Sequence, residues 1–211
     1  MKLYTYFRSS AAYRVRIALN LKGLPYEMVA IHLTKDGGRQ RTPEFRAINP
    51  QMRVPALELS SGEVLTQSLA IIEYLDDIHP EPPLLPADAL ERAKVRAIAQ
   101  MIACDIHPLN NLVALQYIKR QLKHEQPEID AWYHHWVIEG FTAIEAMITP
   151  APYACGAHVT LADICLVPQV YNARRLKAPH DKFPKIVAAE TACLKLAAFD
   201  KARPESQPDA E

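Results

Sequence analysis

The stretch MKLYTYFRSSAAYRVRIALNLKGLPYEMVAIHL, residues 1–33, decides the fold of the first part of the chain. Its segment KLYTYF (2–7) alternates in polarity and is rich in aromatic residues, which is typical of a strand. Ser9 or Ser10 can cap a helix, because small and apolar residues recur at helical spacing after them. YEMVAIHL (26–33) then predicts a second strand. A strand, a helix and a strand in this order predict a βαβ unit with parallel strands.

The region that follows completes an α/β pattern and then changes character. VPALEL (54–59) and EVLT (63–66) flank a Ser-Ser-Gly turn and predict a β-hairpin. SLAIIEYLDDI (68–78) has an apolar stripe at helical spacing. HPEPPLLPADA (79–89) is proline-rich, which favours a linker because proline stiffens the chain and removes donors.

Everything after this linker is expected to be helical. The sequence predicts helices over residues 89–123 with an interruption at Pro108, over 130–148, over 159–176 and over Pro184–Leu196. The third begins with a capping-box pattern, Thr160 to Asp163, and is apolar nearly all round, so we expect it to be central and buried. The final ARPESQPDAE is expected to fray. The fold class is therefore an α/β domain, residues 1–80, followed by an all-helical domain, residues 86–211.

Composition excludes several classes of function. The 211 residues carry no formal net charge, which argues against nucleic acid or an acidic membrane as the main partner. No apolar run is long enough to span a membrane, and the first residues lack the pattern of a signal peptide. The four cysteines form no CxxC pair, which favours free thiols in a reducing cytoplasm. The eight histidines form no ligand motif, so no metal site is expected.

The stretch YFRSSAAYRVRIAL (6–19) places serines and arginines where a strand becomes a helix. A helix start offers unpaired N–H groups and partial positive charge, so Ser9 and Ser10 could hold an anionic atom such as a thiolate. Simple capping is the alternative. The fork of Arg8 suits a carboxylate, unless it is an ordinary surface arginine. Arg14 and Arg16 are interpreted as the polar face of the helix.

Two further features point to the same kind of ligand. Pro55 begins a strand and can be cis, which would turn the backbone of Val54 outward to pair with a peptide-like ligand. Gln67 and Ser68 begin a second helix and offer another place for an anion. An ordinary strand start and ordinary capping are the alternatives. Taken together, the features suit a ligand with a peptide backbone, a carboxylate and a thiolate.

The motifs YFRSSAAYRVRIAL, KDGGRQ, NPQMRVPAL, LTQSLAIIEYLDDIHP, IHPLNN and VTLADICLVPQVYNARRL together resemble zeta-class glutathione transferases over essentially the whole chain. The resemblance implies a thioredoxin-like domain followed by a helical domain, glutathione as cofactor and a homodimer. It also implies cis–trans isomerisation of a maleyl keto-acid to its fumaryl isomer, in which the glutathione thiolate adds to the double bond and leaves again. Maleylpyruvate is favoured over maleylacetoacetate.

The resemblance also assigns site residues. It implies glutathione contacts at Ser9, Ser10, Ala11, Gln40, Val54, Gln67, Ser68, His107, Asn110 and Asn111. It implies that Ser9 acts on the glutathione sulfur and that Arg8 and Arg175 bind the substrate carboxylates, which makes these three the catalytic candidates.

The sequence departs from the family pattern at four positions. Ala11 stands where many members have cysteine, Tyr13 where they have tryptophan, His107 where glutamine is commoner, and Arg174 adds a charge beside Arg175. A transferase that conjugates or dehalogenates small anionic electrophiles is therefore an alternative. A non-enzymatic interaction module is a second one, although such a module need not keep Ser9.

Overall fold

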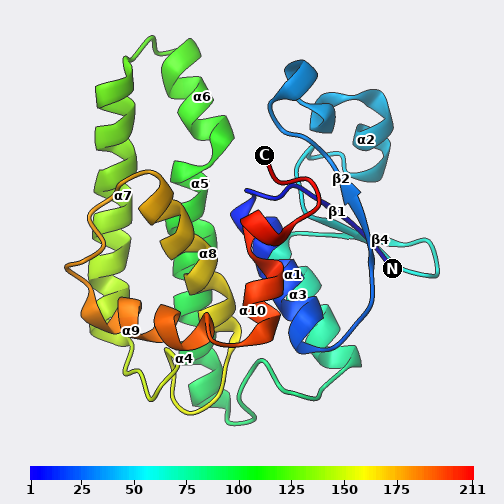
Figure 1. Cartoon of the computed structure of the whole chain (residues 1–211). Helices are drawn as coiled ribbons and strands as arrows, with labels where there is room; N and C mark the ends of the chain where they lie inside the picture. Colours follow the sequence, from blue (N-terminus) through cyan, green and yellow to red (C-terminus); the bar gives the residue numbers. More distant parts are fainter. The chain divides into compact units, whose positions relative to one another are not determined.

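The structure, a computed structural model, describes residues Met1–Glu211 and divides into two compact units. The first unit comprises Met1–Leu84 together with Lys195–Glu211, and the second comprises Leu85–Leu194. Figure 1 shows the sheet of the first unit and the helices of both. No helix is both long and apolar enough to cross a membrane.

The first unit is built on a mixed four-stranded sheet in the order β2-β1-β3-β4. Its strands are β1 (Lys2–Thr5), β2 (Glu27–Ala30), β3 (Ala56–Glu58) and β4 (Val64–Thr66). β1 pairs with β2 in parallel, and β3 pairs with both β1 and β4 in antiparallel fashion. The βαβ unit and the hairpin expected from the sequence are both confirmed, with shorter strands.

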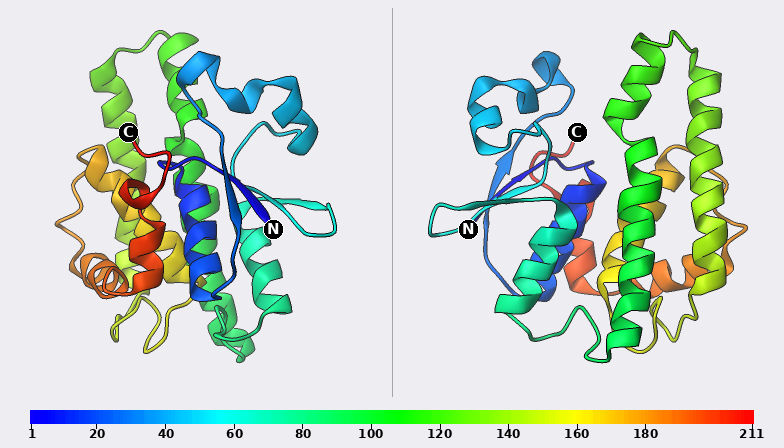
Figure 2. Two further views of the ribbon diagram at one scale, coloured as in Figure 1. Left: turned by 45° about the vertical axis from the view of Figure 1, so that its right-hand side comes forward. Right: turned by 180° about the vertical axis from the view of Figure 1, so that it is seen from behind.

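Helices cover both faces of this sheet because its side chains alternate between them. The helices of this unit are α1 (Ser10–Leu21), α2 (Pro43–Ile48), α3 (Ser68–Ile78) and α10 (Ala197–Ala202), of which α10 packs against α1. Short 3-10 turns lie at Lys35–Gly37, Arg39–Arg41 and Pro204–Ser206. α1 and α3 lie side by side (Figure 2). On one face the ring of Tyr4 meets Phe45 of α2 edge-on at 6.0 Å. Leu3 and Leu57, opposite each other in β1 and β3, are fully buried.

The segment 195–211 corrects the expected domain boundary. The sequence predicts that this segment belongs to the helical domain and that its end frays, whereas it packs in the first unit against α1. Phe199 and Ala202 are fully buried there. The carbonyl of Ala202 accepts a hydrogen bond from Arg16 Nε at 3.1 Å. Apolar burial and this bond to a buried charge hold the segment in place.

The second unit is helical. It contains α4 (Ala89–Gln100), a π-helical segment (Met101–Ile106), α5 (His107–Asn110), α6 (Leu112–Arg120), α7 (Gln126–Met147), α8 (Leu161–Arg175) and α9 (Pro184–Cys193). The interruption expected at Pro108 takes two forms. The turn before it widens into a π-helix, as happens where the normal bonding pattern is disturbed. The helix then stops, because Asn111 is extended and caps α6.

α8 is the buried helix of this unit, as the sequence predicts. Its capping box is formed: the Thr160 side chain accepts from the N–H of Asp163, and the Asp163 carboxylate accepts from the N–H of Thr160 at 2.9 Å. The same carboxylate also accepts from the N–H of Ala154 at 2.8 Å. Burial raises the pKa of Asp163, and these hydrogen bonds oppose the rise. The carboxylate therefore fixes both the start of α8 and the loop before it.

Candidate functional site

The first candidate site lies at the start of α1, where Ser9 is the N-cap residue. Ser9 has extended backbone angles, and its Oγ accepts a hydrogen bond from the N–H of Ala12 at 3.2 Å. The expected capping role is therefore present. A hydroxyl that accepts in this way keeps its own proton, so Ser9 can still donate to an anion. The positive end of the α1 dipole lies at the same place.

Arg8 precedes Ser9 and is held by two aromatic rings. Its guanidinium carbon lies 4.7 Å from the centre of the Phe7 ring and 5.9 Å from that of Tyr6. One of its terminal nitrogens also donates to the Tyr6 hydroxyl at 3.2 Å. No carboxylate of the chain pairs with Arg8, so its charge remains available for an anionic ligand.

Val54 and Gln40 of the first unit each leave a hydrogen-bonding group unused, Val54 in its backbone and Gln40 in its side chain. The Val54–Pro55 peptide is cis, as the sequence suggested. Neither the N–H nor the C=O of Val54 bonds to another main-chain group of the sheet. Gln40 is buried and donates to the carbonyl of Leu33 at 3.2 Å, while its Oε1 has no partner. A peptide-like ligand could use both positions.

The side-chain amide of Gln40 packs against the backbone of Gly38, where a residue with a Cβ would block it. Gly38 has a φ of +95°, and a Cβ there would lie 2.7 Å from the Gln40 amide and 2.8 Å from the carbonyl oxygen of Leu33. Gly38, the second glycine of the KDGGRQ motif, is therefore required by this close approach and by its positive φ.

The start of α3 forms another open place for an anion. Gln67 precedes the helix with a φ of 67°, and its side chain donates to Gln51 at 2.8 Å instead of capping α3. Such strained backbone tends to occur at ligand sites. Ser68 is buried, and its Oγ accepts from Arg14 at 3.3 Å. The first N–H groups of α3 therefore have no side-chain cap and lie beside a buried positive charge.

Arg14 and Arg16 correct the sequence analysis, which placed them on the polar face of the helix. Both are almost completely buried. Arg16 donates to Thr5 Oγ1 at 3.0 Å and to the carbonyls of Tyr6 and Phe7 at 3.3 and 2.9 Å. A buried guanidinium needs such acceptors. No residue of α1 is exposed to water, so this helix has no polar surface on which the two arginines could lie.

The second unit contains three of the expected glutathione contacts. Asn110 is 8% exposed, and neither atom of its amide has a hydrogen-bond partner. Asn111 uses its side-chain oxygen to cap α6, accepting from the N–H groups of Val113 and Ala114 at 2.9 and 3.1 Å. His107 is half-buried at the end of the π-helical segment. An unpaired buried amide is costly, which suits a residue that binds a ligand.

Arg175 lies at the end of α8. It is exposed, and its Nε donates weakly to Asn172 Oδ1 at 3.4 Å. The rest of its guanidinium has no partner in the chain. The buried hydroxyl of Tyr133 on α7 also lacks a partner. Burial raises the pKa of Tyr133, and the charge of Arg175 opposes that rise.

Comparison with known proteins identifies the family. Residues 3–83 match the glutathione S-transferase N-terminal domain. The maleylacetoacetate isomerase of Pseudomonas aeruginosa is 46% identical, over 99% of this chain and 98% of that protein. A solved maleylpyruvate isomerase, a bacterial zeta-class glutathione S-transferase, is 46% identical over the full length of both chains, with a TM-score of 0.95. The chain belongs to the zeta class of glutathione transferases.

A second solved relative was determined with ligands bound. The maleylacetoacetate isomerase of Methylobacterium extorquens AM1, solved with bound malonate and glutathione, is 36% identical over the full length of both chains, with a TM-score of 0.95. The thioredoxin-like domain and the helical domain expected from the sequence are thereby confirmed.

This zeta-class transferase has no protein thiol in its first unit. Ala11 occupies the first turn of α1, and all four cysteines, Cys104, Cys155, Cys165 and Cys193, are free and lie in the second unit. No group of three or more metal-ligating side chains is placed to hold an ion. The chain itself therefore offers a hydroxyl, and not a thiol, at the start of α1.

Arg174, the added arginine, has a structural partner. Its terminal nitrogen lies 2.6 Å from Glu190 Oε2, its Nε lies 3.4 Å from Oε1, and Glu190 is buried. The paired geometry is that of a bidentate bond between a guanidinium and a carboxylate. Arg174 is thus neutralised within the second unit, whereas Arg175 is not.

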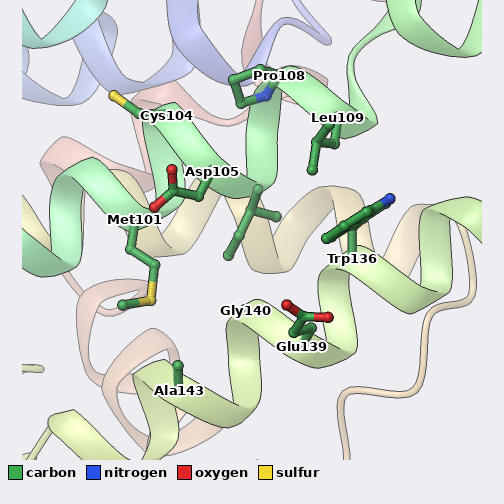
Figure 3. A pocket seen from close by; sticks show the side chains of 10 residues that line it. Met101, Cys104, Asp105, Pro108, Leu109, Trp136, Glu139, Gly140 and Ala143 are labelled. Carbon is green, nitrogen blue, oxygen red and sulfur yellow. The ribbon is translucent and has the colours of Figure 1, made fainter.

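The second unit also contains a cavity of about 440 Å³ between the π-helical segment and α7. Figure 3 shows the apolar side chains that line it and the carboxylates of Asp105 and Glu139 beside them. It is lined by Met101, Cys104, Asp105, Ile106, Pro108, Leu109, Trp136, Glu139, Gly140 and Ala143. No lysine or arginine is among these residues. A dicarboxylate would be repelled by Asp105 and Glu139, so this cavity does not suit the substrate expected for a zeta-class isomerase.

Proposed function

We propose that the protein uses glutathione to catalyse the cis–trans isomerisation of a maleyl keto-acid, maleylpyruvate or maleylacetoacetate, to its fumaryl isomer. The observation that carries this proposal is the Ser9 hydroxyl, which begins α1 and keeps a proton to donate. The activities named for the relatives support it, as does malonate, a small dicarboxylate, in the Methylobacterium enzyme.

The residues of the first unit fit the parts of glutathione. The open backbone of Val54 suits the cysteinyl peptide group, and the start of α3 at Gln67 and Ser68 suits the γ-glutamyl carboxylate. The unpartnered oxygen of buried Gln40 suits an N–H donor. Ser9, with Ser10 and Ala11 beside it, then faces the sulfur. Bound glutathione would supply a thiolate that adds reversibly to the double bond and is regenerated.

The role of Ser9 is to favour the ionised form of the thiol. A free thiol with a pKa of about 8.5 is only ~3% ionised at pH 7. Lowering the pKa by about two units needs about 2.7 kcal/mol of differential stabilisation. A hydrogen bond to a charged group contributes about 1.5–3 kcal/mol, and a helix N-terminus about 0.3–1 kcal/mol. The stabilisation of the thiolate by the Ser9 hydroxyl and the α1 dipole together is therefore large enough to lower the pKa of the thiol by this amount.

The role of Arg8 and Arg175 is to bind the dianionic substrate. Two carboxylates brought toward a thiolate repel it, so cations are needed to offset the repulsion and to orient the acid. Arg8 and Arg175 have no carboxylate partner in the chain, whereas Arg174 has one. The two arginines would also stabilise negative charge that develops on the keto group during the reaction.

Product analysis tests the proposal. The purified protein is mixed with glutathione and each maleyl acid, and both the fumaryl product and the free thiol are measured over time. We expect fumaryl product with no loss of thiol, and no product without glutathione. Loss of one thiol per substrate consumed would show conjugation and overturn the proposal. We favour maleylpyruvate, for which kcat/KM should be higher than for maleylacetoacetate.

We also propose a cytoplasmic homodimer. Four free cysteines suit a reducing compartment. The dimer is proposed from the resemblance to the family. Light scattering on the purified protein should give twice the mass of one 23.7 kDa chain, and the single-chain mass would contradict it.

A further inference from the structure

The segment 195–211 reaches the loop that carries Arg8 and Ser9. It runs along α1, where Asn20 Nδ2 donates to the carbonyl of Ala198 at 3.0 Å. Farther on, Asp209 Oδ2 accepts a hydrogen bond from the backbone N–H of Phe7 at 3.0 Å. Asp209 therefore binds the residue directly before Arg8.

The loop from Tyr6 to Ser9 is held by charged groups on both sides of its backbone. Arg16 binds the carbonyls of Tyr6 and Phe7, and Asp209 binds the N–H of Phe7. The N–H of Ser9 bonds back to the carbonyl of Tyr6 at 2.9 Å. Hydrogen bonds to charged groups are stronger than neutral ones, so this loop is unusually well fixed for a connecting segment.

The same segment is itself well ordered before it reaches the loop. Gln207 is buried, and its amide donates to the carbonyls of Lys201 and Arg203 at 2.9 and 2.8 Å. These bonds fold residues 201–207 into a compact turn. Asp209 is thus presented from a rigid support, as a positioning group requires.

The segment also contacts a second loop of the glutathione site. Glu211 pairs with Lys35 and lies 3.2 Å from His32 Nε2. His32 Nδ1 in turn accepts the N–H groups of Thr34 and Lys35 at 3.2 and 2.9 Å. This turn leads directly into Gln40. The Glu211 pairs are more exposed, so they contribute less than Asp209.

We propose that Asp209 is a positioning residue for catalysis, which fixes the Phe7 amide and so holds Arg8 and Ser9 in register with bound glutathione and substrate. The inference rests on the proposed function. It gives a role in the reaction to residues 202–211, which the sequence predicts to fray. Asp209 touches neither ligand and acts through the loop.

The test compares three variants of the full chain. Asp209→Ala removes the acceptor, and Asp209→Asn keeps an oxygen that can accept from the Phe7 N–H. Asp200→Ala is the matched control, since that carboxylate belongs to the same segment and pairs only with Arg203, at 3.2 Å. Each variant is titrated with glutathione from pH 5 to pH 10 while thiolate absorbance is followed, and kcat and KM are measured at neutral pH.

We expect Asp209→Ala to raise the pKa of bound glutathione and to lower kcat/KM by about 10-fold, the size of one lost hydrogen bond to a charged group. Asp209→Asn should have a glutathione pKa and a kcat/KM close to those of the parent protein. Asp200→Ala should have the parent values of both quantities. If Asp209→Ala does not fold, Asp209→Glu carries the test, because it moves the carboxylate by one methylene and should raise the same pKa.

A parent-like thiol pKa and kcat/KM in a folded but less stable Asp209→Ala would overturn the inference, since Asp209 would then only anchor the segment. The thiol titration does not depend on isomerisation. A parent protein that ionises bound glutathione yet leaves both maleyl acids unchanged would refute the proposed function alone, and the effect of Asp209 on the thiol pKa would still stand.

Discussion

The hydroxyl of Ser9 caps α1 through the N–H of Ala12, and the same hydroxyl is the group proposed to hold the glutathione sulfur. One oxygen can serve both purposes because it accepts with a lone pair and donates with its proton. Capping and catalysis are therefore not competing explanations for this serine. The two roles can be separated by comparing variants that remove only a helix cap with variants that also remove the Ser9 hydroxyl.

Ser9→Ala removes both functions of the hydroxyl. We expect turnover to fall by roughly 10- to 1000-fold, a range that includes the roughly 100- to 1000-fold cost of losing one donor to a developing anion. Loss of the cap should also lower the free energy of unfolding by about 1 kcal/mol. Steady-state kinetics with saturating glutathione and urea denaturation measure the two effects.

A matched control separates the cap from the catalytic role. Asp88 caps α4 through the N–H groups of Leu90 and Glu91, so Asp88→Ala should cost similar stability and leave turnover unchanged. Ser9→Thr, which keeps a hydroxyl, should retain most activity. Parent-like turnover in Ser9→Ala would exclude the proposed action on the thiolate.

Arg175→Ala tests the binding of the substrate carboxylates. We expect KM for the dicarboxylate to rise at least about 10-fold, since a charge-assisted hydrogen bond is lost, while KM for a neutral aryl halide changes little. Arg174→Lys is the control: Arg174 already pairs with Glu190, so its replacement should leave KM for both substrates unchanged. Equal effects of Arg175→Ala on both substrates would remove its assigned role.

The local parts of the fold could be predicted from the sequence because short-range rules govern them. The strand and helix around Ser9, the hairpin before Gln67 and the capping box at Asp163 each depend on residues within a few positions. The parallel pairing of the first two strands then follows from the connection rules for strands joined by a helix.

The parts that were missed depend on contacts between distant residues. Arg16 has helical neighbours that predict a polar face, and its burial depends on tertiary contacts: one of its acceptors, the carbonyl of Ala202, lies 186 positions away in the sequence. The polar composition around Asp209 predicts a disordered end, yet α1 donates hydrogen bonds to the carbonyls of Ala198 and Ala202, and Phe199 is fully buried. The π-helical turn before His107 has no periodic signal of its own.

The pH dependence of Cys155 gives a third prediction. Burial of the sulfur, reinforced by the charge of Asp163, raises the pKa of the Cys155 thiol to about 11, although the residue reaches the surface. The thiolate is the reactive form, so at pH 8 only about one molecule in a thousand is ready to react. Alkylation by iodoacetamide should be slow and should rise about tenfold per pH unit up to about pH 11.

Mass spectrometry of the Cys155 peptide measures that rate. Cys155→Ser serves as the activity control and should keep the parent kcat, because the proposed thiolate belongs to glutathione. Rapid labelling at pH 7 would show a lowered pKa and contradict the expectation.

Gly140 is required by the close approach of α7 to the π-helical segment beside the cavity (Figure 3). A Cβ at this position would overlap Cγ1 and Cδ1 of Ile106, which is buried. Overpacking of this kind costs about 1–3 kcal/mol, whereas replacing glycine with alanine in a helix gains about 1 kcal/mol. We expect the overlap to dominate, so Gly140→Ala should lower the free energy of unfolding.

A double-mutant cycle isolates the contact. Ile106→Ala alone should cost about 2–5 kcal/mol, because it opens a cavity. The double variant should cost less than the sum of the two single changes, because the new methyl group then enters the space that Ile106 left and the helix keeps its gain from alanine. Urea denaturation of the four proteins gives the coupling energy. Additive costs, or a Gly140→Ala protein more stable than the parent, would mean that α7 and the π-helical segment are farther apart than the structure places them.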